Sequence, residues 1–425
     1  MMDWIAQIYA SLNSSPADDR SLFQRDADRI VFSSAFRRLQ QKTQVHPHPQ
    51  TDYVRTRLTH SMEVASVGRS LAGQVARRLA KQSAGLPRDL AADFGDIVAA
   101  ACLAHDIGNP PFGHAGEAAI QSWFDANRAM FGGELSPAQE ADFLKFEGNA
   151  QGFRILTRLQ MDRNAGGMRL TPATLAAFSK YPCASDAREK GGYIGRKKHG
   201  FMQSEQAIFA ANAAAMLTPA LLEDRAWHRH PLVYLVEAAD DICYRIIDVE
   251  DGVKLGRIRF GEAEDICMSI LGPGALSDRY KQRSDDEKLS TLRSMVIGSL
   301  VAACRDAFVD PANGFLDGSA AISLIEATAL SAEAEQLKDM ALERVYRWER
   351  TVMEEVKGIQ VLNDLLDRFV TAAVGGGGAV LRQRLVSLVP HFPKDAPRYE
   401  RLLAVTDYIS GMTDRYAAEM QGRLR

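Results

Sequence analysis

Apolar residues recur at intervals of three and four positions along most of the chain, which is the spacing of one face of an α-helix. In residues 58–79 the apolar positions are Leu58, Met62, Ala65, Leu71, Val75 and Leu79. The same pattern predicts helices over residues 96–104, 205–217, 232–249, 286–304, 333–346, 352–369 and 397–424. Alternation typical of strands is rare, apart from one small β-hairpin expected around residues 193–194 and 254–260. The pattern therefore predicts an all-α fold.

Breaks in this pattern predict loops at residues 47–53, 164–201 and 374–380, the last of which contains four consecutive glycines. A Gly-Pro-Gly sequence at 272–274 interrupts the helical pattern again. We therefore expect a core over residues 1–270 and a helical C-terminal region over residues 271–425. All the residues with candidate chemistry precede this boundary.

Composition narrows the class of protein without identifying a function. The 51 basic and 54 acidic residues give a net charge of −3, which argues against a protein that coats nucleic acid. No apolar run approaches the ~20 residues of a membrane span, and the N-terminus lacks the pattern of a secretory signal. The five cysteines are widely spaced and form no CxxC pair. These features predict a soluble, cytoplasmic protein with reduced cysteines and no membrane association.

The sequence HDIGNPPFGH at residues 105–114 carries the strongest chemical signal. His105 and Asp106 offer one imidazole nitrogen and one carboxylate, a mixed set that suits many divalent metal ions. Adjacent residues on a helix point about 100° apart, so we expect this pair at a helix end, where the backbone can aim both side chains inward. The glycines and prolines that follow predict an irregular turn, after which comes His114.

Two other predicted helices supply further metal-binding side chains. His60 lies in the helix over residues 58–79, and Asp240 lies among apolar residues of the helix over 232–249. Each has an ordinary explanation when taken alone, since His60 fits a structural or surface histidine and Asp240–Asp241 fits a charged helix face. A buried carboxylate is costly unless it is paired or binds a metal. Their combination with the 105–114 sequence predicts one divalent metal (Mn, Mg, Fe, Co or Ni) held by His60, His105, Asp106 and Asp240.

Seven short sequences match one family in order. They are FRRLQQKTQV at 36–45, RLTHS at 57–61, HDIGNPPFGH at 105–114, FEGNAQ at 146–151, KHGF at 198–201, EAADDI at 237–242 and DYISGMTD at 407–414. With them the chain resembles the deoxyguanosinetriphosphate triphosphohydrolases, a bacterial branch of the HD superfamily, from about residue 25 to about residue 415. The resemblance implies an all-α HD-domain core with a C-terminal helical extension that packs on the core and completes the substrate pocket or an oligomer interface.

The resemblance also implies the reaction and the site. A deoxynucleoside triphosphate (dNTP), with dGTP favoured, would be hydrolysed at the α-phosphorus to the deoxynucleoside and inorganic triphosphate. His60, His105, Asp106 and Asp240 match the metal-ligand positions, and His114 and Glu117 match the residues beside the scissile bond. The positions that match substrate-binding residues are Gln44, Val45, Arg57, Lys198, Tyr244 and Asp248. Lys198 ends a basic cluster that would face the triphosphate and comprises Arg188, Lys190, Arg196, Lys197 and Lys198.

The resemblance further implies a homo-oligomer such as a hexamer, and partners that include an activating dNTP or single-stranded DNA. Two alternatives stay open from the sequence. One is another HD-type phosphohydrolase acting on nucleoside monophosphates or signalling nucleotides, which would share the metal ligands but release other products. The other is a non-catalytic HD protein that binds nucleotides or single-stranded DNA, which would show salt-dependent affinity without hydrolysis.

Overall fold

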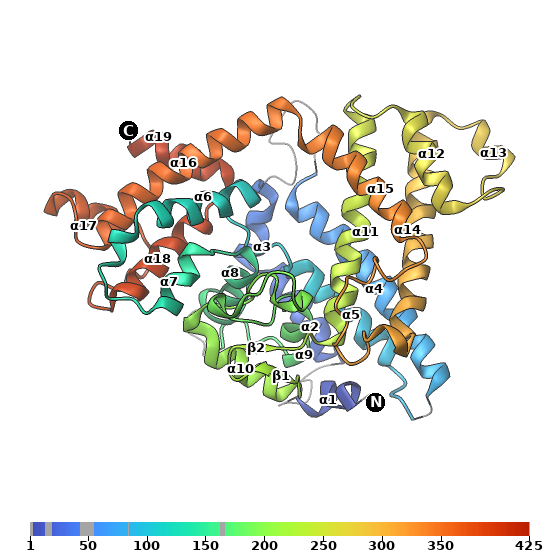
Figure 1. The fold of residues 1–425 in the computed structure, drawn as a ribbon, viewed down its shortest axis with the longest axis horizontal. Coiled ribbons are helices and arrows are strands. Elements are labelled where there is room, and N and C mark those ends of the chain that lie inside the picture. Colours follow the sequence, from blue (N-terminus) through green and yellow to red (C-terminus); the bar gives the residue numbers. More distant parts are fainter. Residues whose placement is uncertain (1–2, 13–18, 43–54, 84, 162–165, 425) are drawn as a thin grey trace.

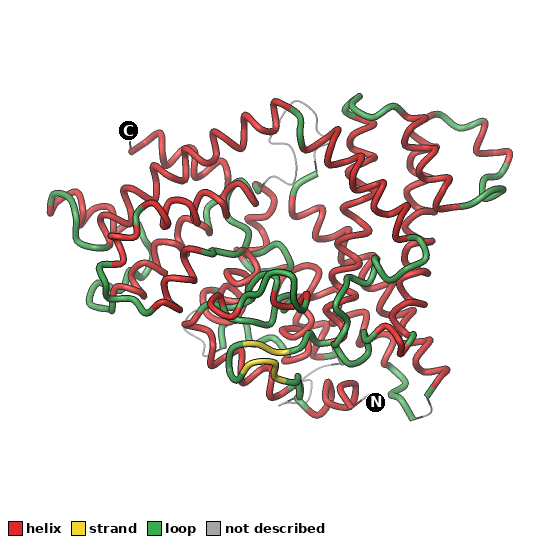
Figure 2. The backbone as a smooth tube through the Cα atoms, in the orientation of Figure 1, coloured by secondary structure: helices red, strands yellow, loops and turns green. Residues whose placement is uncertain are grey.

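Helices make up most of the protein, which confirms the all-α fold (Figure 2). The computed structural model describes residues 3–12, 19–42, 55–83, 85–161 and 166–424. Two short strands, β1 (Ala220–Leu222) and β2 (Ala226–Trp227), form the one sheet within these residues. None of the helices in the described part of the chain combines the length and apolar character needed to cross a membrane.

Two hydrophobic clusters organise the helices (Figure 1). The first cluster takes residues from α1 (Asp3–Ala10), α2 (Leu22–Val31), α3 (Ser34–Arg38), α4 (Arg57–Gln82), α5 (Leu90–Ala104), α9 (Pro172–Phe178), α10 (Gln206–Ala215), α11 (Pro231–Lys254), α12 (Phe260–Leu271), α13 (Asp278–Lys281), α14 (Asp285–Val309) and α15 (Ser331–Ala341). The second takes residues from α6 (Gly113–Ala126), α7 (Pro137–Leu144), α16 (Glu349–Ala373), α17 (Ala379–Ser387), α18 (Arg398–Ser410) and α19 (Asp414–Leu424). Helix α8 (Gly148–Arg154) contributes Ala150 to the second cluster and Phe153 to the first.

The first cluster continues past residue 270, because α13, α14 and α15 contribute Tyr280, Leu292 and Leu337 to it. Helices α16 to α19 lie with α6 and α7 on the other side of the molecule, at the left of Figure 1. The proposed domain boundary near residue 270 stays a prediction, and the hydrophobic packing runs across it.

Close packing of α4, α5 and α11 brings together the helices that carry the predicted metal ligands. Gly68 of α4 makes this possible, since a Cβ at this position would lie 2.7 Å from the Cys102 sulfur of α5 and 3.4 Å from the Ala239 Cβ of α11. A larger residue would push these helices apart. All five cysteines are buried free thiols.

Three predictions about local structure need correction. The two-stranded sheet lies at 220–227, not near 193–194 and 254–260, where the chain forms 3₁₀ turns and helix ends. The predicted loop over 164–201 contains α9, whose start is stabilised by the Thr171 side chain and by Pro172 in the first turn. The predicted helix over 397–424 is two helices, α18 and α19, separated around Gly411.

Candidate active site

A cavity of about 320 Å³ collects most of the predicted site residues. Its walls come from α4, the end of α5, the start of α6, α11 and the segments that flank α8 and α9. The predicted residues among its lining are Arg57, His60, His105, Asp106, His114, Glu117, Lys198, Asp240 and Tyr244. Side chains as far apart in sequence as Arg57 and Tyr244 therefore line one cavity.

Three of these residues form a compact group of metal-binding type. The His60 Nε2 atom lies 3.1 Å from Asp240 Oδ1, and the His105 Nε2 atom lies 3.6 Å from the same oxygen. One ligand atom from each of the three residues lies within 4.8 Å of the other two. Two imidazole nitrogens and a carboxylate at these separations suit one divalent metal ion.

The orientation of His105 supports this interpretation. Helix α5 ends at Ala104, so His105 lies at the helix end as predicted from the sequence. Its Nδ1 atom lies 2.7 Å from the carbonyl oxygen of Cys102, and donation of the Nδ1 proton to that carbonyl leaves Nε2 with its lone pair toward Asp240. Metal-binding histidines are commonly fixed by such a bond from their other nitrogen. The three side chains thus fit a divalent metal.

Asp106 lies beside this group but is held by two other residues. The Arg57 guanidinium donates to Asp106 Oδ2 at 2.8 Å, and the side-chain amide of Asn109 donates to Oδ1. Asp106 Oδ2 lies 3.6 Å from His105 Nε2. Burial favours the neutral acid, but the positive charge of Arg57 outweighs it and lowers the Asp106 pKa to about 2. Asp106 is therefore an ionised oxygen donor at the edge of the group, and its role as a ligand stays a prediction.

His114 and Glu117 form a hydrogen-bonded pair at the first turn of α6. The His114 Nδ1 atom lies 2.8 Å from Glu117 Oε2, and the other Glu117 oxygen accepts the Gly148 backbone N–H at 2.7 Å. The Glu117 carboxylate is buried, whereas 83% of the His114 side chain is exposed. The bond to Glu117 raises the pKa of His114. Burial opposes ionisation of Glu117, but His114 and Lys198 outweigh it and lower the Glu117 pKa. The pair therefore favours the protonated form of the His114 imidazole.

The two predicted phosphate-binding residues line the cavity, each next to a carboxylate. Arg57 bonds to Asp106, and the Lys198 ammonium lies 2.8 Å from Glu147 Oε1. Among the residues described, Lys198 is the member of the 188–198 basic cluster that lines the cavity. Both cations lie in the cavity, and their role in binding phosphate stays a prediction.

Tyr244 and Asp248 follow Asp240 on α11, and only the first lines the cavity. The Tyr244 ring stacks on Tyr346, with centroids 5.6 Å apart and an interplanar angle of 28°. The Tyr346 hydroxyl donates to Asp248 Oδ2 at 2.7 Å, and burial raises the Asp248 pKa to about 7. The predicted contact residues Gln44 and Val45 lie outside the described residues.

Some residues of the cavity were not predicted. Tyr346 comes from η8 (Leu342–Tyr346), far along the chain, and nothing near it in sequence marks it as a site residue. Lys180 and Glu237 also line the cavity and form an ion pair at 3.3 Å. The sequence could have indicated Glu237 as a site residue, because it lies one turn before Asp240 on the same face of an apolar helix.

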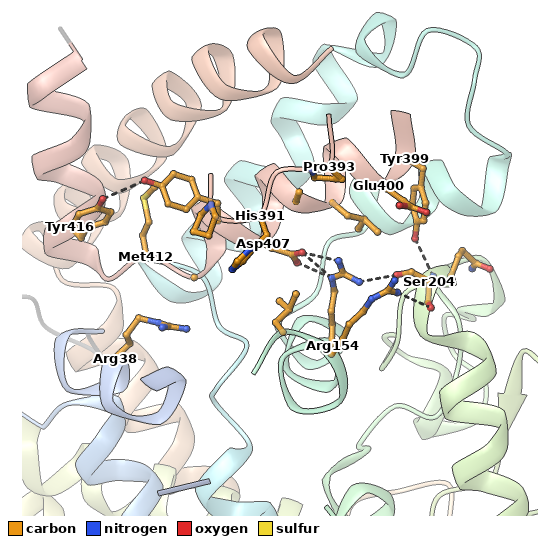
Figure 3. Close-up of a pocket in the computed structure, with 18 of the residues that line it drawn as sticks. Arg38, Arg154, Ser204, His391, Pro393, Tyr399, Glu400, Asp407, Met412 and Tyr416 are labelled. Carbon is orange, nitrogen blue, oxygen red and sulfur yellow. Dashed lines mark hydrogen bonds and ion pairs between the residues drawn. The ribbon is translucent and has the colours of Figure 1, made fainter. Parts of the chain in front are cut away.

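A second cavity of about 1100 Å³ lies between η3 (Ile155–Leu159), α18 and the start of α19 (Figure 3). On one side Arg154 bonds to both oxygens of Asp407, and Tyr399 reaches the Ser204 backbone (Figure 3). Gly411, Met412 and Thr413 line it as well. None of the predicted site residues lines this cavity within the part of the chain described.

A helical core that presents one histidine, a His-Asp dipeptide and a further aspartate to one cavity defines the class of HD-domain phosphohydrolases, which depend on a metal. Residues 57–146 match the HD domain, and residues 326–423 match the phosphohydrolase-associated domain. These matches cover His60, His105 and the C-terminal helices, whereas Asp240 lies between the two matched ranges.

The chain belongs to the family of deoxyguanosinetriphosphate triphosphohydrolase-like proteins. It is 42% identical to such a protein of Pseudomonas aeruginosa LESB58 over 99% of this chain and 98% of the relative. It is 42% identical to one of Synechocystis over 96% and 94% of the two chains, and 35% identical to one of Listeria innocua over 97% and 95%. The family predicted from the sequence is therefore confirmed, and the chain is a member of a hydrolase family.

Proposed function

We propose that this protein hydrolyses dNTPs at the α-phosphorus and releases the deoxynucleoside and inorganic triphosphate. The observation that carries the proposal is the joint placement, in one cavity, of a metal-binding group and a separate histidine–carboxylate pair. A non-catalytic nucleotide-binding protein would need the cations of the cavity but not the His114–Glu117 pair. Similarity to proteins named as triphosphohydrolase-like supports the same activity.

His60, His105 and Asp240 would hold the divalent metal, with Asp106 as a further oxygen donor after release from Arg57. When bound there, the metal would supply a Lewis acid next to the α-phosphate. Arg57 freed from Asp106 becomes available to a phosphate oxygen. We therefore assign to Arg57 the neutralisation of Asp106 and, in the substrate complex, of part of the phosphate charge.

His114 would protonate the leaving oxygen. In the proposed step the water oxygen forms a bond to the α-phosphorus and gives up one proton to the solvent. The bond from phosphorus to the 5′ oxygen breaks, that oxygen takes the proton of His114 Nε2, and a proton from the solvent then restores the imidazolium. Glu117 binds the other ring nitrogen and stabilises the charged imidazole before the transfer. Lys198 would neutralise part of the triphosphate charge, since it lines the same cavity, and it would exchange its contact with Glu147 for a phosphate oxygen.

The stacked pair of Tyr244 and Tyr346 offers a flat apolar surface to a sugar or base. The Asp248 carboxylate behind it fixes the Tyr346 hydroxyl. We assign this part of the cavity to the deoxynucleoside. The predicted preference for dGTP, the homo-oligomer, the activating dNTP, the binding of single-stranded DNA and the cytoplasmic location rest on the family resemblance and stay predictions.

The test is an assay of metal-stripped protein with each of the four dNTPs and with GTP, with and without Mn²⁺ or Mg²⁺, followed by anion-exchange separation of the products. Deoxynucleoside and intact triphosphate that appear only with metal are the expected result. The matched control is His114→Ala, which should bind the same metal and turn over roughly 10²–10⁴-fold more slowly. Orthophosphate or pyrophosphate as the product would contradict cleavage at the α-phosphorus and favour another HD-type phosphohydrolase. Nucleotide binding without turnover, in dNTP mixtures as well, would favour a non-catalytic binder.

A further inference from the structure

The loop between Asp106 and His114 joins the metal-binding group to the histidine–carboxylate pair, so its position sets their separation. It includes Phe112, whose backbone is left-handed with φ 62°, a conformation that non-glycine residues rarely adopt. The Phe112 backbone N–H donates to Asp414 Oδ1 at 3.0 Å. Asp414 is the first residue of α19, about 300 positions further along the chain. A C-terminal helix thus holds the loop at its least favourable backbone position.

Lys42 makes a second connection between the same two parts of the chain. Its ammonium donates to the Asn109 carbonyl at 2.5 Å and to the Ser410 carbonyl, at the end of α18, at 3.0 Å. Lys42 is only 3% exposed, and a buried ammonium is costly unless it is hydrogen-bonded. An apolar side chain would fill the same space without the free-energy cost of burying an ammonium group. The two carbonyl bonds are therefore the reason that a lysine fits here.

Both ends of Lys42 are connected to Asp106 through one intermediate residue. Its side chain bonds to the Asn109 carbonyl, and the Asn109 side chain donates to Asp106 Oδ1. Its backbone carbonyl accepts the Arg57 N–H at 3.2 Å, and the Arg57 guanidinium donates to Asp106 Oδ2. The connection through Asn109 depends on the Lys42 side chain, whereas the connection through Arg57 uses the backbone carbonyl that any residue at position 42 supplies.

The loop is packed closely on its remaining sides. A Cβ at Gly108 would lie 2.1 Å from the Gly148 carbonyl oxygen, and a Cβ at Gly358 of α16 would lie 2.5 Å from the Phe112 ring. The loop is therefore enclosed by α8, α16 and the segment from Ser410 to Asp414. The segment from Ser410 to Asp414 holds the loop through hydrogen bonds. Residues 411–413 of this segment also line the second cavity (Figure 3).

We propose that Lys42 and Asp414 are positioning residues, which attach the loop between Asp106 and His114 to the segment from Ser410 to Asp414 and so fix the catalytic geometry. The proposal rests on the proposed function for its catalytic consequence. Neither side chain lines the cavity among the described residues, so both act through the loop. The C-terminal helices then contribute to turnover without supplying a reacting group.

The first test compares Asp414→Ala with Asp414→Asn. The alanine removes the acceptor of the Phe112 N–H, and we expect kcat to fall by about tenfold to a hundredfold with KM within about threefold, because the loop shifts by a fraction of an ångström or more. The asparagine keeps an amide oxygen for the same bond and should restore kcat to within about threefold of the wild type. Asp310→Ala is the matched control, because Asp310 accepts the Ala312 N–H at 3.0 Å outside the cavity lining.

A merely structural role for Asp414 would lower the unfolding temperature of Asp414→Ala and Asp310→Ala alike and leave kcat per folded molecule within twofold of the wild type. That result would overturn the proposal. Equal losses of kcat in Asp414→Ala and Asp414→Asn would also overturn it, since they would show that the hydrogen bond to the loop is not what matters.

The second test does not depend on turnover. Lys42→Met keeps the length of the side chain and removes its donors, and titration calorimetry with Mn²⁺ measures the metal affinity. We expect affinity to fall by about threefold to tenfold, which is less than for a direct partner of a metal ligand, because the Lys42 side chain acts on Asp106 through Asn109. Unchanged Mn²⁺ affinity in a folded Lys42→Met protein would overturn the proposal. If the wild type hydrolysed no dNTP, the proposed function would fail, while this comparison would still decide the role of Lys42.

Discussion

Glu117→Gln tests the proposed proton donor while leaving His114 in place. The two Glu117 oxygens serve two donors, His114 Nδ1 at 2.8 Å and the Gly148 N–H at 2.7 Å. A glutamine has one oxygen and one NH₂ group, so it cannot accept from both. If Gly148 keeps the oxygen, the NH₂ group faces His114 and disfavours a proton on Nδ1. The variant therefore loses the interaction that stabilises the protonated imidazole.

The size of the effect follows from the exposure of His114. A hydrogen bond to a charged group contributes roughly 1.5–3 kcal/mol, and water competes for an imidazole whose side chain is 83% exposed. We therefore take the lower end, about 1.5 kcal/mol, which is about tenfold in kcat. The bond to Glu117 raises the His114 pKa, so the donor stays protonated further into the alkaline range. Its loss should move the alkaline limb of the kcat profile to lower pH, so the deficit grows as pH rises.

The assay is single-turnover hydrolysis of a dNTP from pH 5 to pH 9 at saturating metal, for the wild type, Glu117→Gln, His114→Ala and the double variant. If Glu117 acts through His114, Glu117→Gln should cost less than about threefold in the His114→Ala background. An alkaline limb that does not move, or a full tenfold loss in that background, would refute the assigned roles of this pair.

Asp106→Ala removes an oxygen donor and leaves Arg57 without its carboxylate, so we expect no measurable turnover with any dNTP; near-normal turnover would contradict the mechanism. Asp142 is buried and its pKa is raised by burial to about 7, so the native state holds its proton more strongly than the unfolded chain. Its contribution to stability is present below about pH 4 and lost as pH rises through about 7, by up to about 1.4 kcal/mol per pH unit. Asp142→Asn should remove this slope in urea unfolding, and an identical slope in both proteins would exclude Asp142 as its source. Gly108→Ala would place a Cβ 2.1 Å from the Gly148 carbonyl oxygen, and should cost about 1–3 kcal/mol or more of unfolding free energy; unchanged stability would show that the loop can move away.

The sequence predicted the helices and the metal-binding group because both depend on local patterns. The 3.6-residue period marks helices α4, α5 and α11, and each of these carries or ends at one histidine or aspartate of the group. The hairpin was placed wrongly because strands of two and three residues carry too few positions to show alternation. Helix α9 was missed because its start, Thr171-Pro172, was taken as loop punctuation, although threonine followed by proline is also a helix-start signal.

What the sequence could not supply was which distant residues share the cavity. Tyr346 enters it because α15 and η8 pack along α11, and Lys180 because its loop passes Glu237. Arg57 was predicted to bind phosphate, which stays a prediction, and its bond to Asp106 was not predicted. Side-chain pairing across the fold depends on tertiary distances, which periodicity does not encode.

The proposed reaction uses side chains from helices of both hydrophobic clusters. The metal-binding group belongs to α4, α5 and α11 of the first cluster, whereas α6, which carries Glu117, buries Ile120 and Phe124 in the second. Polarisation of an α-phosphate oxygen and protonation of the 5′ oxygen act on the same phosphorus, so a shift of about 1 Å between the clusters would reduce turnover. The short loop after Asp106 connects the metal-binding group to helix α6 along the chain. With the proposed attachment to the segment from Ser410 to Asp414, the C-terminal helices of this chain would contribute to turnover without supplying a reacting group to the described cavity.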